Sequence, residues 1–485
     1  MSPNPAPRDQ MERDSTTSRA SRSKPHHRSG FAVAVVAVGI VTAIAVASAV
    51  VVTLVAMLVS AASRLPQSFD RGFLSGLTTW DSGTKLAAVA IFGVTYLVMA
   101  IGKLPGYQLD RAGAALLGAS LMVGVGAISL DQAYRAIDFG TITLLLGMMI
   151  VVANLRLSGF FQLVSNWVVM RARHPLVLLI AIVLIAGAFS AFLVNDTVCL
   201  VMTPLVLDFV RRLKRDPVPY LLAIAMASNA GSTATITGNP QNMIIGGFSQ
   251  IPYDAFAAAL WPVAAMGMLL TALLIFLIYR REFLTTERLP ELPMRPTRVH
   301  RFLVFRSVFV TAAMMVLFFA GQSVAKVAIV GGALLLFTRS IKAEKVYREI
   351  DWPLLLMFVG LFIVVAGFEA SVLSPDTIRL VSGLDLDHAG ALSLATAALS
   401  NLVSNVPAVL VLKPLVAASA NPQHTWLIVA MASTLAGNFT LVGSVANLIV
   451  AQRAEAEGVS IGFWAYFKVG APLTVLSVLF GIYWL

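Results

Sequence analysis

The sequence predicts an all-α polytopic membrane protein with two inverted repeats, each of five transmembrane helices plus a re-entrant hairpin, and one extra N-terminal helix. Its composition, its recurring apolar runs and an internal repeat predict this fold class. Of the 485 residues, 58% are hydrophobic and only 12% are charged, whereas roughly 25% of an average soluble domain is charged. Runs long enough to cross a hydrocarbon core of about 30 Å recur from residue 31 onward. A lipid bilayer is therefore the expected solvent.

Eleven apolar segments are predicted to span the membrane. They lie at about 31–60, 86–101, 112–130, 139–155, 218–248, 253–279, 302–320, 323–338, 353–373, 426–450 and 462–485. Two further segments, at about 175–210 and 389–419, are interrupted near their centres by polar residues and are predicted to be the re-entrant hairpins. The first span lies within residues 31–62. We interpret it as an uncleaved extra helix, because the run is too long for the core of a signal peptide.

Positive charge predicts the orientation. Most of the 35 Lys and Arg residues fall in segments that face the cytoplasm if the N-terminus is inside, as the positive-inside rule requires. Residues 1–30 are rich in Ser, Pro and Arg, which predicts a disordered cytoplasmic tail, and residues 280–301 form a basic cytoplasmic linker between the repeats. The net charge of +11 lies in loops rather than in a basic stripe with aromatic residues, so nucleic acid is not an expected partner.

Three blocks of the sequence occur twice in the same order, which predicts a duplication. The segment around Asp138 matches the segment around Asp351, and two polar blocks follow in both halves. The matched pairs are Ser190 and Ser400, Asn195 and Asn405, Pro204 and Pro414, Ser228 and Ser433, Thr235 and Thr440, Gly238 and Gly443, and Asn242 and Asn447. Repeat 1 is expected at 86–279 and repeat 2 at 302–485. Because each repeat has an odd number of spans, the second must be inserted upside down, which is typical of secondary transporters.

Both predicted hairpins turn at polar tips, Asn195-Asp196-Thr197 and Ser404-Asn405. Unwound backbone at this depth is tolerated only where it is buried in protein or lines a wet cavity. Asn and Ser are good N-cap residues, so a half-helix is expected to begin at each tip and to offer free N–H groups to an anion. Asp196 is an acidic residue expected deep in the membrane, where it would bind a coupling cation or exchange a proton. The alternative is a structural carboxylate that caps a half-helix.

The helices that follow the hairpins contain polar, glycine-rich blocks, Ala227–Asn242 and Ala432–Asn447. Carbonyl groups freed by unwinding, together with Ser, Thr and Asn oxygens, could bind Na⁺. The candidate binding residues in these blocks are Ser228, Asn229, Thr233, Gly238, Asn239, Asn242, Ser433, Asn438, Thr440, Gly443 and Asn447. Na⁺ is a candidate coupling ion at Asn195, Gly238, Asn405 and Gly443. For several of these residues the alternative is close helix packing by small side chains.

No catalytic site is expected. The single cysteine, Cys199, lies in an apolar stretch, and the six histidines show no metal-ligand spacing, so the only cofactor considered is Na⁺. Asp138 and Asp351 open their helices at equivalent positions, and we interpret both as structural N-caps. A membrane-embedded enzyme usually needs clustered carboxylates, which the apolar segments lack, so this class remains a remote alternative.

The motifs SAFLVNDTVCLVMTPLVL and ASNAGSTATITGNPQNMIIG, with SNLVSNVPAVLVLKPLV and ASTLAGNFTLVGSVANLIV in the second half, resemble the ion transporter superfamily. That group includes arsenite permeases, sodium/divalent-anion symporters, citrate transporters and NhaD-type antiporters, and the sequence most resembles the YbiR-type anion permeases. The resemblance covers about residues 86–485. It implies two hairpin-bearing bundles, often in a dimer, that move like an elevator.

The resemblance also implies roles for the two tips. Sodium/dicarboxylate symporters of this group carry Ser-Asn-Thr at both tips, where sodium and substrate carboxylates bind. This chain has Asn195-Asp196-Thr197 and Ser404-Asn405-Val406 instead, and Asn-Asp at the first tip is similar to the arsenite permeases.

We therefore expect a secondary active transporter in the bacterial inner (plasma) membrane, with several passes and a cytoplasmic N-terminus. The expected cargo is a small inorganic or carboxylate anion, coupled to Na⁺ or H⁺. The alternatives within transport are a Na⁺/H⁺ antiporter, an arsenite efflux permease and a channel. The expected partners are the anion, the lipid bilayer and a second copy of the chain in a homodimer.

Overall fold

The computed structural model describes residues 83–102, 109–286, 288–290, 299–338, 341–372 and 388–485. Within these ranges every regular element is a helix, which confirms the all-α class. The predicted tail at 1–30 and the predicted extra helix at 31–62 lie outside the described residues.

The first half of the described chain contains long helices, one helix pair and one interrupted helix. Its elements are α3 (Gly83–Ile101), α4 (Arg111–Gly124), α5 (Leu130–Ala136), α6 (Phe139–Ser158), α7 (Phe160–Arg171), α8 (Pro175–Phe192), α9 (Asn195–Arg212), α10 (Pro217–Ser232), the 3₁₀ turn η1 (Ile236–Gly238), α11 (Pro240–Ser249) and α12 (Tyr253–Ile278). A short helix, α13 (Arg280–Phe283), follows in the predicted linker.

The second half repeats this order. Its elements are α14 (Arg301–Phe319), α15 (Val324–Leu336), α16 (Ala343–Tyr347), α17 (Trp352–Val372), α19 (Ala389–Val403), α20 (Asn405–Ala417), α21 (Pro422–Ala436), η2 (Leu441–Gly443), α22 (Val445–Ala456) and α23 (Phe463–Trp484). The pair α19–α20 corresponds to α8–α9, and α21–η2–α22 corresponds to α10–η1–α11.

Local signals set many helix boundaries. Ser129 and Gln132 form a reciprocal capping box at the start of α5. Proline opens α8, α10, α11 and α21, where its missing N–H costs no helical hydrogen bond. Gly159, with φ 86°, ends α6 and lets α7 begin at the next residue. The sequence prediction missed α5, α7 and α16, which are short or flank longer apolar runs.

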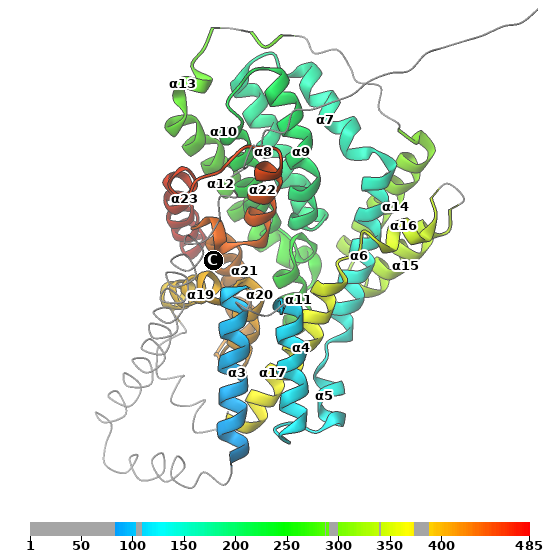
Figure 1. Cartoon of the computed structure of the whole chain (residues 1–485), viewed down its shortest axis with the longest axis vertical. Helices are drawn as coiled ribbons and strands as arrows, with labels where there is room; N and C mark the ends of the chain where they lie inside the picture. The colour runs from blue at the N-terminus through cyan, green and yellow to red at the C-terminus, as the bar shows by residue number, and fades with distance from the viewer. Residues whose placement is uncertain (1–82, 103–108, 287, 291–298, 339–340, 373–387) are drawn as a thin grey trace, which may run out of the picture. The chain divides into compact units, whose positions relative to one another are not determined.

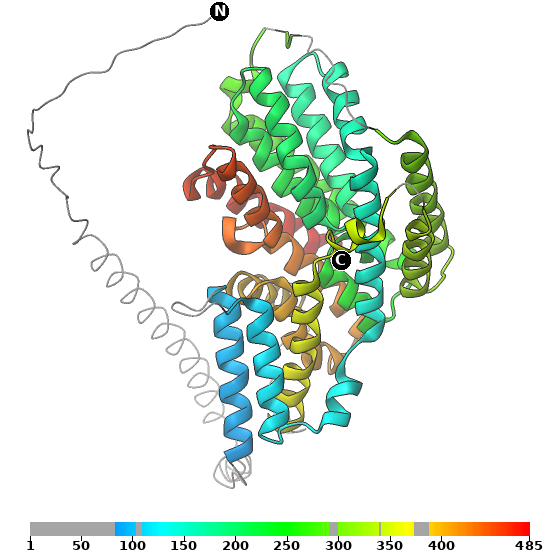
Figure 2. The same cartoon turned by 45° about the vertical axis from the view of Figure 1, so that its right-hand side comes forward.

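Helices of the two halves interlock in two matched groups. α17 packs against α3 and α4, and α6 packs against α14 and α15, as Figures 1 and 2 show. Each group thus takes one helix from the opposite half. Glycines permit the close approach: a Cβ on Gly147 would lie 2.5 Å from the backbone of Ala328, and one on Gly360 would lie 2.6 Å from the backbone of Ala115.

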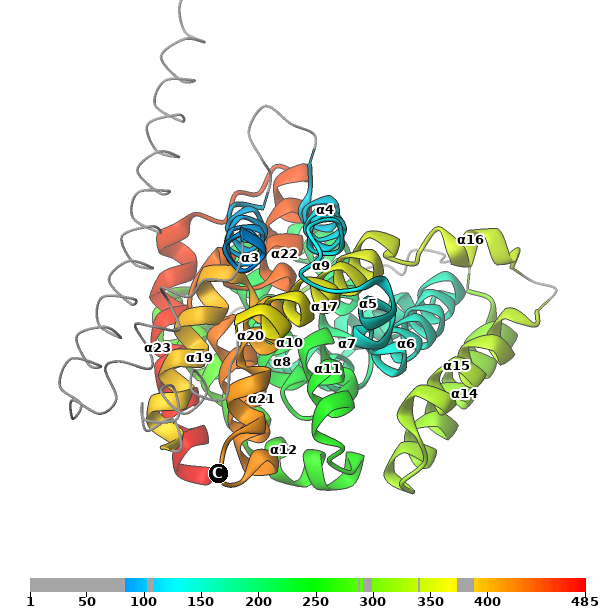
Figure 3. The same cartoon turned by 90° about the horizontal axis from the view of Figure 1, so that it is seen from below.

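The paired and interrupted helices form a third group. α10 packs against α8, α9, α12 and α22, and α21 packs against α11, α19 and α23. Figure 3 shows α14 and α15 on one side of the view, with α19 and α23 on the opposite side. The third group carries the two polar tips and both helix breaks.

Seven described helices are long and apolar enough to cross a membrane: Thr84–Ile101, Phe139–Ser158, Pro175–Phe192, Tyr253–Ile278, Arg301–Phe319, Trp352–Ser371 and Phe463–Trp484. The predicted spans at 112–130 and 323–338 are shorter helices, α4 and α15. The predicted spans at 218–248 and 426–450 are interrupted by η1 and η2, because their polar, glycine-rich blocks do not continue an α-helix.

Outward-facing apolar side chains fit a lipid environment. Phe302, Phe305 and Phe309 lie on one face of α14 and are 72%, 69% and 64% exposed. A contiguous aromatic face of this kind is unusual on a protein surface in water, whereas hydrocarbon chains solvate it well.

Candidate functional site

The two helix pairs turn sharply at equivalent positions. Val194, with φ 55°, precedes α9, and Ser404, with φ 81°, precedes α20. A non-glycine residue in this region costs of order 1–3 kcal/mol, and such strain clusters at functional sites. A positive φ at both tips lets each second helix begin at an asparagine, Asn195 or Asn405.

An asparagine closes each interrupted helix in the same way. The Nδ2 atom of Asn242 donates to the carbonyl oxygens of Ser232 (3.2 Å) and Thr235 (3.0 Å). The Nδ2 atom of Asn447 donates to the carbonyl oxygens of Gly437 (2.7 Å) and Thr440 (3.2 Å). We call each set an asparagine clasp. Because each clasp gives hydrogen bonds to carbonyls that the break frees from the helix, it stabilises the break.

Asn229 joins the first tip to the second interrupted helix. Its Oδ1 atom accepts from Asn195 Nδ2 (3.1 Å) and Ser444 Oγ (3.1 Å). Its Nδ2 atom donates to the Oδ1 atoms of Asn438 (2.9 Å) and Asn447 (3.0 Å). Asn229 is only 1% exposed, so this buried amide network fixes the two halves against each other.

A cavity of about 270 Å³ lies where the tips and the breaks meet. Six helices contribute residues from their N-terminal ends to its lining: α4, α9, α11, α17, α20 and α22. Each such end carries free N–H groups and a partial positive charge. The polar lining residues are Asp110, Arg111, Asn195, Asp196, Gln241, Asp351, Ser404, Asn405 and Ser444.

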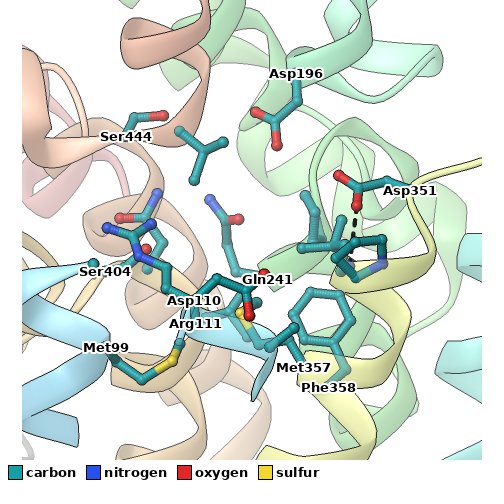
Figure 4. A pocket seen from close by; sticks show the side chains of 18 of the residues that line it. Met99, Asp110, Arg111, Asp196, Gln241, Asp351, Met357, Phe358, Ser404 and Ser444 are labelled. Atoms are coloured by element: carbon teal, nitrogen blue, oxygen red, sulfur yellow. Dashed lines mark hydrogen bonds between the residues drawn. The ribbon is translucent and has the colours of Figure 1, made fainter. Parts of the chain in front are cut away.

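The charged residues occupy different parts of the cavity wall. Figure 4 shows Asp196 and Asp351 at one end, with the Arg111 side chain on the side of Ser404. Asp110 accepts from Gly113 N (2.8 Å) at the start of α4. Asp196 is half-buried, and its carboxylate has no hydrogen bond to another described residue. The wall therefore offers one cationic and three acidic side chains to a solute.

Two buried oxygens at the tips lack hydrogen-bond donors. The Oδ1 atoms of Asn195 and Asn405 have no partner among the described residues, although the two side chains are only 3% and 8% exposed. An unpaired buried acceptor costs about 1–3 kcal/mol, and a bound cation would offset that cost. No group of three or more His, Cys, Asp and Glu side chains in the described ranges could hold a metal ion.

Comparison with known proteins identifies the family. Residues 94–436 match the model of the citrate transporter family. The chain belongs to the citrate transporter family.

Curated relatives and a solved structure agree with this assignment. The silicon efflux transporter LSI3 of Oryza sativa subsp. japonica is 29% identical over 81% of this chain and 95% of its own length. The 46 kDa membrane protein of Mycobacterium leprae is 30% identical over 83% of this chain and 98% of its own length. The crystal structure of the Alcanivorax borkumensis YdaH transporter covers 83% of this chain and 97% of its own, with a TM-score of 0.52 at 14% identity. This member of the citrate transporter family is therefore a membrane transporter, and the predicted resemblance to the ion transporter superfamily is confirmed.

Some of the site residues predicted from the sequence line the cavity of this family member, and others lie in the network behind it. Asn195, Asp196, Ser404 and Asn405 line the cavity. The buried network behind it contains Ser228, Asn229, Asn239, Asn242, Asn438 and Asn447. Asn242 and Asn447 shape the breaks and do not line the cavity.

The remaining predicted residues have local contacts. Thr233 donates to Asn229 O within its own helix (3.2 Å), Ser433 donates to Ala430 O (3.4 Å), and Thr440 donates to Asn401 Oδ1 (3.4 Å). Thr197 lies one residue beyond Asp196 in α9, outside the cavity lining. Gly238 and Gly443 lie at tight contacts, where an added Cβ would be 2.1 Å from Ser232 O and 2.7 Å from Asn401 Oδ1 respectively.

Sequence reasoning missed Arg111, Gln241 and Ser444, which also line the cavity. Arg111 is the first residue of α4 and lies one residue before the predicted span at 112–130. Asp351 was interpreted as a structural N-cap, and it does accept from Leu354 N (3.0 Å). It also lines the cavity, which the prediction did not foresee.

Proposed function

We propose that this protein is a secondary active transporter that moves a small inorganic or carboxylate anion across the bacterial inner membrane, coupled to Na⁺ or H⁺. The observation that carries the proposal is the convergence of six helix N-terminal ends and Arg111 on one cavity. The proposal includes the two inverted repeats at 86–279 and 302–485, a cytoplasmic N-terminus and a homodimer in the bilayer.

The proposal that the cargo is an anion depends on the positive charge around the cavity and on the cavity volume. Each helix N-terminus carries about half a positive elementary charge, and a guanidinium binds carboxylate or oxyanion groups with two parallel hydrogen bonds. The cavity of about 270 Å³ has room for a solute of several water volumes, each about 30 Å³. These features favour a small oxyanion or a short carboxylate near Arg111.

A second candidate function is Na⁺/H⁺ antiport. Three carboxylates line the cavity beside a single guanidinium, and Asp196 has no hydrogen-bond partner among the described residues. A cation or proton would balance this excess of acidic groups without any anion. Arsenite efflux remains a third candidate, and the silicon efflux transporter among the relatives adds a silicon-containing solute to the substrates to be tested.

Uptake into proteoliposomes tests the proposal. We would measure uptake of labelled sulfate, phosphate, citrate, succinate, arsenite and silicic acid under a Na⁺ or a pH gradient. For the anion that is transported, Arg111→Gln is expected to raise the half-saturation concentration at least about tenfold, since about 1.4 kcal/mol corresponds to each factor of ten. Asp196→Asn is expected to abolish accumulation against a gradient while anion binding persists.

Arg135→Gln is the matched control, because Arg135 is 81% exposed and pairs only with Asp131 on the surface of α5. It should transport like the wild type. Exchange of Na⁺ for H⁺ by the wild type, without dependence on any solute in the panel, would instead establish the antiporter.

A further inference from the structure

Two aspartates at equivalent positions of the two halves have different surroundings. Asp138 precedes α6, and its Oδ1 atom accepts from Gly140 N (2.9 Å) and Thr141 N (3.2 Å) while its Oδ2 atom accepts from Thr141 Oγ1 (2.5 Å). Asp351 precedes α17 in the same way, but among the described residues only its Oδ1 atom accepts a hydrogen bond, from Leu354 N (3.0 Å). Asp138 is therefore fully occupied as a helix cap, whereas Asp351 keeps a free oxygen.

The sequence explains why Asp351 accepts fewer hydrogen bonds than Asp138. The residues that follow Asp138 at the donor positions are Gly140 and Thr141, and their counterparts after Asp351 are Pro353 and Leu354. Proline has no N–H, and leucine has no hydroxyl. Two donors present in the first half are thus absent from the second.

The free oxygen of Asp351 belongs to a cavity that a second carboxylate also lines. Asp196 and Asp351 both line the cavity, and Figure 4 shows both carboxyl groups turned toward its interior. The other charged residues of the cavity are Asp110 and Arg111 of α4, and Figure 4 shows the Arg111 side chain on the side of Ser404. Asp196 is half-buried and Asp351 is exposed, and two carboxylates that face one cavity repel each other unless a cation or proton lies between them.

A third, uncharged oxygen points to a ligand at the same place. Asn195 precedes Asp196 at the tip, lines the cavity and is 3% exposed, yet its Oδ1 atom has no hydrogen-bond partner among the described residues. Carboxylate and amide oxygens are hard donors that suit a small cation such as Na⁺. The cavity thus supplies two acidic ligands and one amide ligand.

We propose that Asp196, Asp351 and Asn195 form the site of one monovalent cation, Na⁺ or H⁺, to which each half of the chain contributes one carboxylate. This inference rests on the proposed function, because it identifies the site of the coupling ion. α17 packs mainly against α3 and α4, whereas α9 packs mainly against α10 and α22. A displacement of one helix group against the other would separate the two carboxylates and release the cation, which ties ion release to movement.

Cation binding to the purified full-length protein tests the site. We would measure the shift in melting temperature with NaCl against N-methyl-D-glucamine chloride, and the protons released when NaCl is added in weak buffer. Asp196→Asn and Asp351→Asn are each expected to weaken Na⁺ binding at least about tenfold. Asp138→Asn is the matched control and should bind within about twofold of the wild type, since Asn is also a good N-cap.

A second variant keeps the Asp351 carboxylate but gives its free oxygen a hydrogen-bond donor. Leu354→Thr restores the hydroxyl donor that Thr141 supplies in the first half, so it should weaken Na⁺ binding by roughly fivefold, the value of one net hydrogen bond. If Na⁺ has no effect but the wild type binds a proton that Asp196→Asn and Asp351→Asn both lose, the occupant is H⁺. Wild-type cation and proton binding in Asp351→Asn, or equal losses in Asp138→Asn, would overturn the site.

Anion binding in the same samples separates this inference from the proposed function. We would measure the thermal shift with each anion in Na⁺-free buffer at fixed pH. An anion response lost in Arg111→Gln but kept in Asp351→Asn, together with unchanged cation binding in Asp351→Asn, would refute the cation site alone. A cation response without any anion response would refute anion transport alone.

Discussion

The two helix-pair tips share a backbone and differ in side chains. Val194 and Ser404 both adopt a positive φ, 55° and 81°, and an asparagine follows each of them. The next residue is Asp196 in the first half and Val406 in the second. The common features fix the turn and the start of the half-helix, whereas the position after the asparagine is free to set the charge of the cavity.

The interrupted helices extend this comparison. The clasps of Asn242 and Asn447 bond equivalent carbonyls. Each Oδ1 atom also accepts from the other half, in Asn447 from Asn229 Nδ2 (3.0 Å) and in Asn242 from Thr434 Oγ1 (3.5 Å). The two halves therefore keep the same backbone scaffold around the breaks. They differ in the polar groups that reach across from one half to the other.

The largest expected effect comes from removing a clasp. Asn447→Leu and Asn242→Leu each remove three side-chain hydrogen bonds, at about 0.5–1.5 kcal/mol for each bond, so the loss of unfolding free energy should be roughly 1.5–4.5 kcal/mol. Asn447→Leu should be the more harmful, because Gly437 O then has no other donor among the described residues, whereas Ser232 O keeps Asn239 Nδ2 when Asn242 is replaced. Unfolding by SDS titration in mixed micelles would measure both.

Asn154→Leu is the control for this experiment. Asn154 is fully buried in α6, and its side chain makes one hydrogen bond within the described residues, to Ile150 O of the same helix (2.8 Å). Leucine there leaves no carbonyl without its helical donor, so stability should change by less than about 1 kcal/mol. Clasp variants as stable as this control would show that the breaks persist without the asparagines.

Alanine substitution should destabilise the protein unequally at the glycines of the two breaks, Gly238 and Gly443. A Cβ at Gly238 would lie 2.1 Å from Ser232 O, a backbone atom, whereas one at Gly443 would lie 2.7 Å from Asn401 Oδ1, a side-chain atom that can move. Overpacking costs about 1–3 kcal/mol, so we expect Gly238→Ala near the upper value and Gly443→Ala near the lower one. Melting temperatures in detergent would rank them, and the reverse order would contradict the argument.

The smallest effect is expected where the halves meet at the surface. Arg156 of α6 forms an ion pair with Glu349, and the two side chains are 34% and 24% exposed. Arg156→Met should lower the unfolding free energy by at most about 1 kcal/mol, and added salt should shrink the difference from the wild type. A loss well above that of Gly443→Ala would mean that ionic contacts, rather than buried amides, hold the halves together.

Much of the fold could be predicted because its signals are local. The apolar runs gave the long helices within a few residues, and the polar blocks at Ala227–Asn242 and Ala432–Asn447 became the observed breaks. The short helices α5 and α7 were missed, since neither has an apolar run of spanning length. The family resemblance was confirmed, whereas the inverted orientation of the repeats, the coupling ion and the roles of the site residues stay predictions.

By itself, the sequence determined the all-helical membrane fold, the polar tips and the helix breaks, because hydrophobicity, helix propensity and capping depend on neighbours along the chain. Only the tertiary structure decided that Arg111 and Asp351 share a cavity with Asp196, and that Asn229 links Asn195 to Asn447. These partners are separated by long stretches of sequence, and the packing of helices from both halves sets their distances. Whether an aspartate caps a helix or also faces a solute depends on those neighbours in space.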